Sequence, residues 1–321
     1  MSLQVNGVPL DDPQRVFVIA EGSANHGRDY ATAVALTHAA AEAGASAIKW
    51  QTFTADTLAA DVPLLRGYDA AHDAWLTRLG AQTMHDLFRQ GGLPRPWHVP
   101  LQSLAASLGL VFLSTPFSLD DARFLVEQVR VPALKIASGD LTHRALLRYA
   151  GSTGLPVIVS TGASTLGEIH DALDVLDDGS QDGAVLERVC LLHCVSCYPC
   201  PLDAVNVRAV ETLRYQALVA AYGFSDHTLS VDVVPALAVA YGATCYEKHL
   251  KLTSDATGVD TDHSLTPAQF ATLVRVLREA SLAVGNGVKQ PHVSEAHERL
   301  WARRGTDDLR PTDAARAGRW A

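Results

Sequence analysis

Val16-Phe-Val-Ile-Ala20, Ala133-Leu-Lys-Ile136 and Val157-Ile-Val159 are three of the eight short apolar runs that decide the fold. The other five runs are Ala45–Ile48, Leu110–Leu113, Val189–Leu192, Ala220–Phe224 and Ala243–Tyr246. Each run is followed by a segment that can form a helix. Continuous apolar strands that alternate with helices are typical of a parallel sheet covered on both faces. We therefore predict an α/β fold, a (β/α)8 TIM barrel over residues 15–286.

An open, doubly wound sheet is the main structural alternative. Such a sheet usually has a glycine-rich phosphate turn after its first strand, and Glu21-Gly-Ser-Ala-Asn-His26 is not one. Outside the strands, residues 54–92 form a long insertion after the second strand. We expect residues 1–14 to form a short N-terminal cap with a turn at Asn6-Gly7, and residues 287–321 to form a linker-like C-terminal tail.

The composition is that of an ordinary globular protein, with 48% hydrophobic residues in a chain of 321. The formal net charge of -9 argues against nonspecific binding of nucleic acid. An anionic substrate would need a local cluster of positive groups. The sequence contains no apolar run long enough for a membrane helix and no signal-peptide pattern, so we expect a cytoplasmic protein with reduced cysteines.

Polar side chains collect at the C-terminal end of every predicted strand. They are Glu21, Lys49, Gln51, Ser114, Thr115, Lys135, Ser138, Ser160, Thr161, His193, Ser196, Tyr198, Ser225, Asp226, His227, Glu247, Lys248 and His249. Active sites of TIM barrels lie at this end of the strands. Because all eight strand ends carry such residues, the sequence predicts one continuous site.

The residue types in this set indicate the chemistry. Two lysines and several hydroxyls can bind a phosphate and a carboxylate. His227 and His249, 22 residues apart, could ligate a divalent metal together with carboxylates and water. Carboxylates can also act as general bases. The set suits a phosphorylated carboxylate and a carbonyl group polarised by a metal.

The order of motifs along the chain resembles the sialic acid synthase family. The motifs are Glu21, Asn25-His26, Lys49-Trp-Gln-Thr-Phe53, Ser114-Thr-Pro-Phe117, Lys135-Ile-Ala-Ser-Gly139, Ser160-Thr-Gly162, His193-Cys-Val-Ser-Cys-Tyr-Pro199, Ser225-Asp-His-Thr228 and Glu247-Lys-His249. This family includes the synthases of N-acetylneuraminate, legionaminate and pseudaminate and their spore-coat polysaccharide relatives. The resemblance covers residues 14–304.

The resemblance implies a carbon–carbon-forming transferase of carbohydrate and polysaccharide biosynthesis. It would condense phosphoenolpyruvate with a sugar aldehyde, release phosphate and give a sialic-acid-like α-keto acid sugar. By the same resemblance, His227 and His249 hold Mn2+ or Mg2+. Phosphoenolpyruvate would be bound by Lys49, Thr115, Lys135, Ser138, Ser160, Ser196 and Ser225. The catalytic residues on the acceptor and metal side would be Glu21, Gln51, Tyr198 and Asp260, with Glu21 activating the water.

The sequence departs from the family pattern in its acceptor half. Asp140 stands where the family has Glu, and Gly258-Val-Asp-Thr261 replaces Gly-Pro-Asp-His. Typical members continue into a small antifreeze-like domain that gives an arginine to the partner's acceptor pocket, whereas this sequence ends at Ala321. We therefore expect that N-acetylmannosamine is not bound in the usual way. A tail arginine (Arg303, Arg304, Arg310, Arg316 or Arg319) or a separate protein could replace the missing contact, or the acceptor could be a different aldehyde, which we favour. We also expect a homodimer, because Leu300, Trp301, Leu309 and Trp320 need burial, either in an interface or against the barrel of the same chain.

Three other interpretations remain open at this point. Cys190-x3-Cys194-x2-Cys197 has the spacing of a radical-SAM iron–sulfur site, but Cys190 lies within a predicted strand and should be packed. A metal-dependent aldolase or hydrolase could use the same barrel, although Ile19-Ala-Glu21 lacks the His-x-His that amidohydrolase-type enzymes carry on their first strand. A catalytically degenerate homologue that only binds a sugar is the third.

Overall fold

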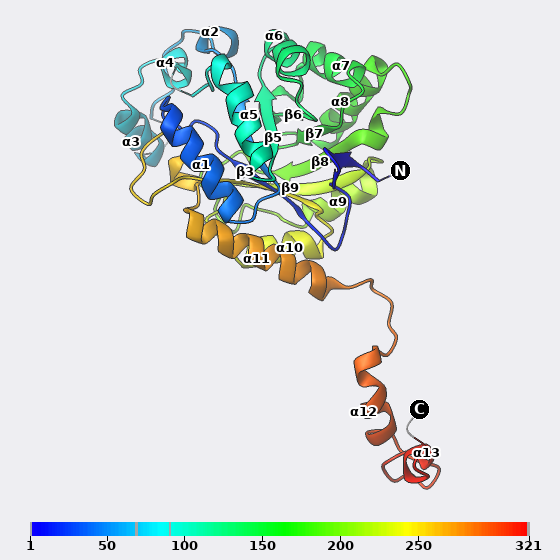
Figure 1. The fold of residues 1–321 in the computed structure, drawn as a ribbon. Coiled ribbons are helices and arrows are strands. Elements are labelled where there is room, and N and C mark those ends of the chain that lie inside the picture. The colour runs from blue at the N-terminus through cyan, green and yellow to red at the C-terminus, as the bar shows by residue number, and fades with distance from the viewer. Residues whose placement is uncertain (1, 68–69, 90, 320–321) are drawn as a thin grey trace. The chain divides into compact units, whose positions relative to one another are not determined.

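The computed structural model describes residues 2–67, 70–89 and 91–319. The chain divides into two compact units, Met1–Ala283 and Val284–Ala321, which are described separately (Figure 1). In the described residues, no helix is both long and apolar enough to cross a membrane.

The first unit is built on eight parallel strands. They are β3 (Phe17–Glu21), β4 (Ala47–Thr52), β5 (Val111–Pro116), β6 (Leu134–Ile136), β7 (Val157–Ser160), β8 (Val189–Cys194), β9 (Ala221–Asp226) and β10 (Cys245–His249). Their order in the sheet is β5-β4-β3-β10-β9-β8-β7-β6. The first barrel strand, β3, thus pairs in parallel with the last, β10. β5 and β6 lie side by side where the ring closes. The predicted (β/α)8 barrel is confirmed.

Helices follow the strands and cover the outside of the barrel (Figure 1). They are α1 (Tyr30–Glu42), α5 (His98–Ser107), α6 (Leu119–Arg123), α7 (Arg144–Ser152), α8 (Leu166–Gly179), α9 (Ala209–Gln216), α10 (Val233–Ala240) and α11 (Pro267–Val284). The insertion after β4 carries α2 (Ala55–Leu58), α3 (Ala70–Leu79) and α4 (Met84–Phe88).

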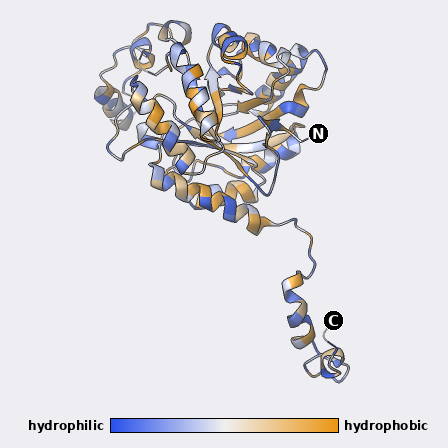
Figure 2. Ribbon diagram, viewed as in Figure 1, coloured by the Kyte–Doolittle hydropathy of each residue, from blue (hydrophilic) through white to orange (hydrophobic). Residues whose placement is uncertain are grey.

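Local capping explains where several helices begin. Ser118 accepts a hydrogen bond from the Asp121 amide at the start of α6, and Thr165 forms a capping box with Glu168 at the start of α8. The hydropathy colouring shows apolar residues along the strands and mixed faces on the surrounding helices (Figure 2). The core therefore lies partly between strands and helices and partly inside the barrel.

The interior of the barrel is layered along its axis. Side chains of a strand alternate between its two faces. The inward positions nearer the N-terminal ends are apolar, and they include Phe17, Ile19 and Ile158. The hairpin of β1 (Gln4–Val5) and β2 (Val8–Pro9) adds Leu3, Val5 and Leu10 to the same cluster. The N-terminal end of the barrel is thereby filled with apolar side chains, and the polar inward positions lie at the opposite end.

The hairpin turns at Asn6-Gly7, and both residues have positive φ angles, 51° and 79°. Asn-Gly favours this left-handed geometry in two-residue turns.

The second unit contains α12 (Ala296–Trp301) and α13 (Asp313–Arg316). Within it, Ala315 is buried while Trp301 and Leu309 are exposed. Trp320, for which the sequence predicts burial, lies outside the described residues.

Candidate active site

A buried cluster of charges lies at the C-terminal end of the barrel. Lys49 on β4 faces Glu21 on β3, its register partner, with 2.6 Å between Nζ and Oε2. The same ammonium group lies 3.6 Å from Oε1 of Glu247 on β10 and donates a 3.1 Å hydrogen bond to Thr115 Oγ1 on β5. Four strands thus bring one cation, two carboxylates and a hydroxyl together in the barrel interior.

A second buried lysine extends the cluster across the barrel. Lys135 on β6 donates a 2.6 Å hydrogen bond to Ser160 Oγ on β7 and lies 3.8 Å from Glu247 Oε2. Ser225 on β9 donates to the other oxygen of Glu247 at 3.3 Å. Burial lowers the pKa of Lys135. Although burial alone would raise the pKa of Glu247, Lys135 and Lys49 lower it overall, so Glu247 stays ionised between the two cations.

Glu21 has a different electrostatic environment from Glu247. Burial and the nearby Glu247 charge outweigh the attraction of Lys49 and raise the pKa of Glu21 to about 7. The Gln51 amide donates to Glu21 Oε1 at 3.1 Å and to Ser23 Oγ at 2.8 Å, which fixes the carboxylate. A carboxylate whose pKa lies near neutrality can accept or donate a proton at the operating pH.

Two hydroxyls meet at Gly162, just after β7. The Gly162 amide donates a 2.9 Å hydrogen bond to Ser138 Oγ. A Cβ atom at position 162 would lie 2.5 Å from Ser196 Oγ and 2.9 Å from Ser138 Oγ. Glycine is therefore needed for this close approach. A cavity of about 580 Å3 adjoins this point, and its lining includes Thr161, Ser164, His193, Cys194, Ser196 and Asn206.

A group of potential metal ligands lies beyond β10. One ligand atom from each of His249, Asp260 and His263 lies within 4.8 Å of the others. His249 Nδ1 and His263 Nε2 are buried and have no hydrogen-bond partner among the described residues. Burial lowers the pKa of both histidines, so both imidazoles are neutral and can donate a lone pair. Two neutral imidazoles and a carboxylate are a donor set that fits a divalent ion.

His227 and Tyr198 flank this group. The His227 ring lies 5.6 Å from that of His249 and 5.5 Å from that of His263. His227 Nδ1 donates to the Val195 carbonyl at 2.9 Å, which leaves Nε2 as the nitrogen with a free lone pair. The Tyr198 ring lies 4.3 Å from His227 and is 55% exposed, so it forms the solvent side of the site.

The predicted site residues fall into three groups. The lysine–carboxylate cluster contains Glu21, Lys49, Gln51, Thr115, Lys135, Ser160 and Ser225; the hydroxyl pair contains Ser138 and Ser196; the metal-ligand side contains Tyr198, His227, His249 and Asp260. Ser23 connects two of the groups, since it accepts from Gln51 and donates to Asp260.

Three residues of the site had no predicted role. Glu247 could have been found from its spacing, because it precedes His249 by two residues on one strand and must face the same side. His263 lies three residues after Asp260, in a 3-10 turn that brings the two side chains within 3.8 Å. Ser23 follows β3 directly and carries no comparable signal.

The two departures from the family pattern have separate consequences. Thr261 donates to the Gly258 carbonyl at 3.1 Å, so its hydroxyl closes a turn of the loop. Burial raises the pKa of Asp140 to about 6, and its Oδ2 has no hydrogen-bond partner among the described residues.

The cysteine spacing does not produce a cluster. Cys190 is fully buried in the apolar interior of the barrel, as predicted, whereas Cys197 is exposed. Within residues 2–67, 70–89 and 91–319, the one group of potential metal ligands is the histidine–aspartate group.

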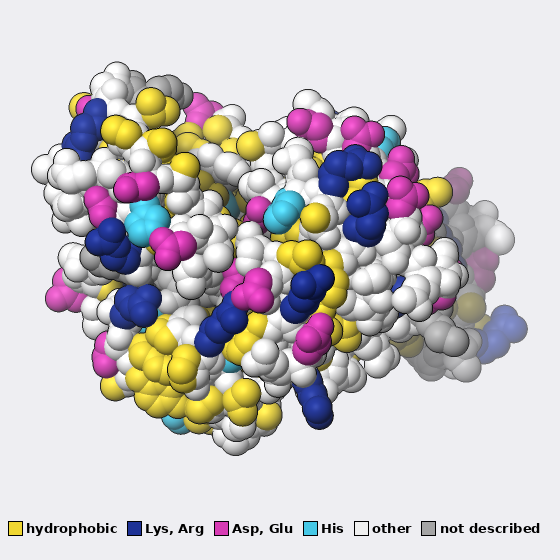
Figure 3. All heavy atoms as spheres, turned by 90° about the horizontal axis from the view of Figure 1, so that it is seen from above, with side chains coloured by type: hydrophobic (Ala, Val, Ile, Leu, Met, Phe, Trp, Pro, Cys, Tyr) yellow, Lys and Arg dark blue, Asp and Glu magenta, His cyan; other side chains and the backbone are white. Residues whose placement is uncertain are grey.

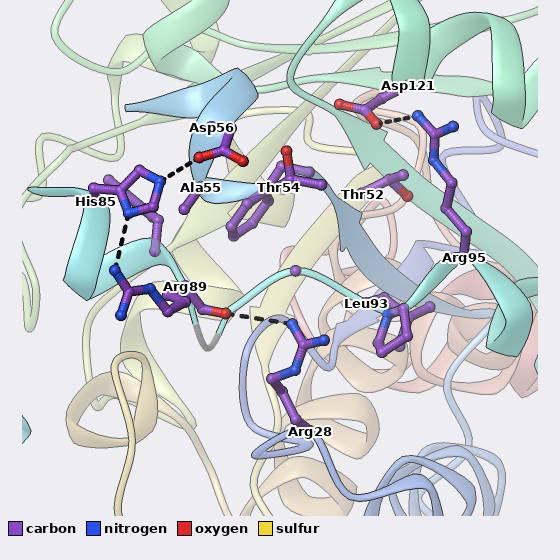
Figure 4. A pocket seen from close by; sticks show the side chains of 14 residues that line it. Arg28, Thr52, Thr54, Ala55, Asp56, His85, Arg89, Leu93, Arg95 and Asp121 are labelled. Atoms are coloured by element: carbon purple, nitrogen blue, oxygen red, sulfur yellow. Dashed lines mark hydrogen bonds and ion pairs between the residues drawn. The ribbon is translucent and has the colours of Figure 1, made fainter. Parts of the chain in front are cut away.

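A separate cavity of about 480 Å3 lies beside the insertion (Figure 4). Its arginines are already engaged: Arg95 pairs with Asp121 at 3.0 Å, and Arg89 contacts His85. Arg28 donates to the Arg89 carbonyl at 3.3 Å. Basic and acidic side chains are likewise interspersed over the face seen in Figure 3. The two buried lysines are therefore better placed than this cavity to bind a small anion.

Comparison with known proteins agrees with this geometry. A model of the NeuB family matches residues 36–289. The N,N'-diacetyllegionaminic acid synthase of Legionella pneumophila is 35% identical over 94% of this chain and 82% of its own length. That of Campylobacter jejuni is 32% identical over 88% and 81%. The crystal structure of N-acetylneuraminic acid synthetase from Leptospira borgpetersenii, in complex with citrate, superimposes with a TM-score of 0.78 and 28% identity, covering 93% of this chain and 95% of that one.

Proposed function

Because this chain belongs to the NeuB family, we propose that it condenses phosphoenolpyruvate with a sugar aldehyde to form a sialic-acid-like α-keto acid sugar and phosphate. Its relatives are synthases of sialic-acid-like sugars, and the chain is accordingly an enzyme of that general kind. The choice of phosphoenolpyruvate, of the metal and of the acceptor is the proposal.

The observation that carries the proposal is the pair of buried lysines. Lys49 and Lys135 are both buried beside Glu247, so two cations share this carboxylate and can also attract an anionic substrate. Each ammonium group has three N–H donors. A substrate with a carboxylate and a phosphate can accept hydrogen bonds from the lysine N–H groups that Glu21 and Glu247 do not occupy. We assign Thr115, Ser160 and Ser225 as further contacts to phosphoenolpyruvate, because their hydroxyls contact the lysine–carboxylate cluster. We add Ser138 and Ser196, whose hydroxyls meet at Gly162, just after the strand that carries Ser160.

The residues on the other side of the site divide the remaining tasks. His227, His249 and Asp260 would hold a divalent ion, Mn2+ or Mg2+, which as a Lewis acid polarises the aldehyde. C3 of phosphoenolpyruvate then bonds to the aldehyde carbon, whose oxygen takes up a proton. Water adds to C2, Glu21 accepts the proton of that water, and phosphate leaves to give the keto group. Gln51 holds Glu21 in place, and Tyr198 closes the acceptor side.

An acceptor panel tests this proposal against its alternatives. The purified chain is incubated with phosphoenolpyruvate, Mn2+ and N-acetylmannosamine, other N-acylated hexosamines or simple aldoses. A synthase releases phosphate only with a suitable acceptor and yields a product three carbons larger. An aldolase or hydrolase would leave phosphoenolpyruvate intact, and a degenerate binding protein would bind it without releasing phosphate.

We also propose that the enzyme is cytoplasmic and forms a homodimer. The exposed Trp301 and Leu309 of the second unit support an apolar interface. Light scattering at micromolar concentration is expected to give twice the mass of one chain, and a purely monomeric protein would contradict the dimer.

A further inference from the structure

The segment after β10 folds back onto that strand and carries two of the potential metal ligands. Leu265 forms a parallel bridge with Leu250, and its amide donates to the His249 carbonyl at 2.9 Å. Asn25 donates to both Leu250 O and Ser264 Oγ, at 2.9 and 2.8 Å. These bonds fix the backbone of residues 260–265 beside the end of β10. The position of His263 is therefore set by the fold and does not depend on a mobile loop.

The Asp260 carboxylate is oriented from its other side. Ser23 donates to Oδ2, and the Ala24 amide approaches the same oxygen at 3.5 Å. Oδ1 is turned toward His263 Nε2, 3.8 Å away. Carboxylates that bind metals are commonly held in this way by hydrogen bonds to the oxygen outside the coordination sphere.

The two imidazoles converge with this carboxylate. The rings of His249 and His263 lie 4.4 Å apart and are nearly perpendicular, at 69°. His263 is 2% exposed, and its Nε2 has no hydrogen-bond partner among the described residues. Buried polar atoms normally have a partner. A histidine that merely fills space in a polar core would be expected to bond a carbonyl or hydroxyl, as His98 does with Thr52.

We propose that His263 is a protein ligand of the divalent ion, together with His249 and Asp260, and that its nitrogen strengthens the binding of Mn2+ or Co2+ relative to Mg2+. The inference rests on the proposed function and deepens it. Imidazole nitrogen suits transition metals, whereas Mg2+ prefers oxygen ligands and retains several waters. With His227 close by, up to three imidazoles and one carboxylate surround the ion.

Metal binding to the purified chain tests the inference without any turnover. Free Mn2+ is titrated by electron paramagnetic resonance, and Co2+ binding is followed by its visible absorption. Wild-type protein is compared with His263→Ala and with His170→Ala, which removes an exposed imidazole that bonds the Gln216 carbonyl at 2.8 Å. His263→Ala is expected to weaken Mn2+ binding by at least about 10-fold and to change the Co2+ spectrum. Loss of a residue that only hydrogen-bonds to a metal ligand already lowers metal affinity by about 10-fold or more. His170→Ala is expected to bind like wild type.

Magnesium competition tests the selectivity. Mg2+ should displace Mn2+ from wild type only at large excess, and the excess required should fall in His263→Ala.

Thermal unfolding with and without Mn2+ checks that each variant is folded. If the alanine variant does not fold, His263→Asn, which keeps a polar side chain, takes its place. Either folded variant should lose most of the metal-induced rise in Tm.

Two results would overturn the inference. One is unchanged Mn2+ affinity and Co2+ spectrum in a folded His263 variant while His249→Ala loses both. The other is the absence of metal binding by wild type. The first outcome leaves the proposed function intact, and the second would remove the metal from it. The reaction itself is read separately, from phosphate release in the acceptor panel. Conversely, absence of phosphate release alongside His263-dependent Mn2+ binding would remove the proposed reaction and leave the metal site in place.

Discussion

Lys135→Ala is expected to weaken phosphoenolpyruvate binding strongly while the protein stays folded. The Lys135 side chain is 3% exposed, and among the described residues its ammonium group has polar contacts to Ser160 Oγ, the Ile136 carbonyl and, at 3.8 Å, Glu247. It is thus a desolvated cation with donors to spare. A hydrogen bond between charged groups contributes about 1.5–3 kcal/mol, so losing one such contact corresponds to a roughly 10- to 150-fold higher Kd.

Isothermal titration calorimetry of phosphoenolpyruvate, without acceptor, measures this Kd directly. Lys49→Ala should show a loss of similar size, because Lys49 is equally buried. Lys289→Ala, which removes an exposed lysine of the second unit, is the matched control for a change of net charge. Unchanged affinity in both the Lys49 and Lys135 variants would refute the assignment of the lysines to the substrate.

Three further predictions concern single residues of the barrel. Gly162→Ala should abolish phosphoenolpyruvate binding in calorimetry with little change in Tm, because its methyl group would lie 2.5 Å from Ser196 Oγ; normal binding would contradict the hydroxyl pair as a substrate contact. Since burial raises the pKa of Glu21 to about 7 and a base must be deprotonated, kcat/KM should fall as pH drops below about 7. In Glu21→Gln that acidic limb should disappear with most of the activity, and an unaltered profile would exclude Glu21 as the base. Lys248→Met should lower the free energy of unfolding by about 3–5 kcal/mol in urea titrations, because it leaves Asp226, 3.2 Å away and fully buried, without its cation. A loss below about 1 kcal/mol would show that this pair matters little.

The fold was predictable because the apolar runs mark the strands directly. The runs at residues 16–20 and 243–246 became β3 and β10, but both strands continue further, to Glu21 and His249, which are register partners. A search for apolar residues alone ends these two strands too early. Their parallel pairing continues through the polar residues at the C-terminal end of the barrel. The same layer explains why the strand ends indicated a site.

The contacts within the site were less accessible from the sequence. That Glu247 lies between two lysines depends on which strands face one another across the barrel, which no local pattern reveals. The family pattern does not indicate His263, because it expects a histidine at position 261, where this chain has threonine. Its placement beside His249 follows from the bridge between Leu250 and Leu265, a tertiary contact.

The central claim is that carbon–carbon bond formation at C3 of phosphoenolpyruvate is followed by addition of water at C2 and loss of phosphate. Phosphoenolpyruvate labelled with 18O in the bridge between C2 and phosphorus tests it directly, with the best acceptor from the panel and mass spectrometry of both products. The account predicts that the label leaves entirely with the inorganic phosphate and that the sugar product gains three carbons. Label retained in the keto group, or phosphate formed at the same rate without acceptor, would contradict it.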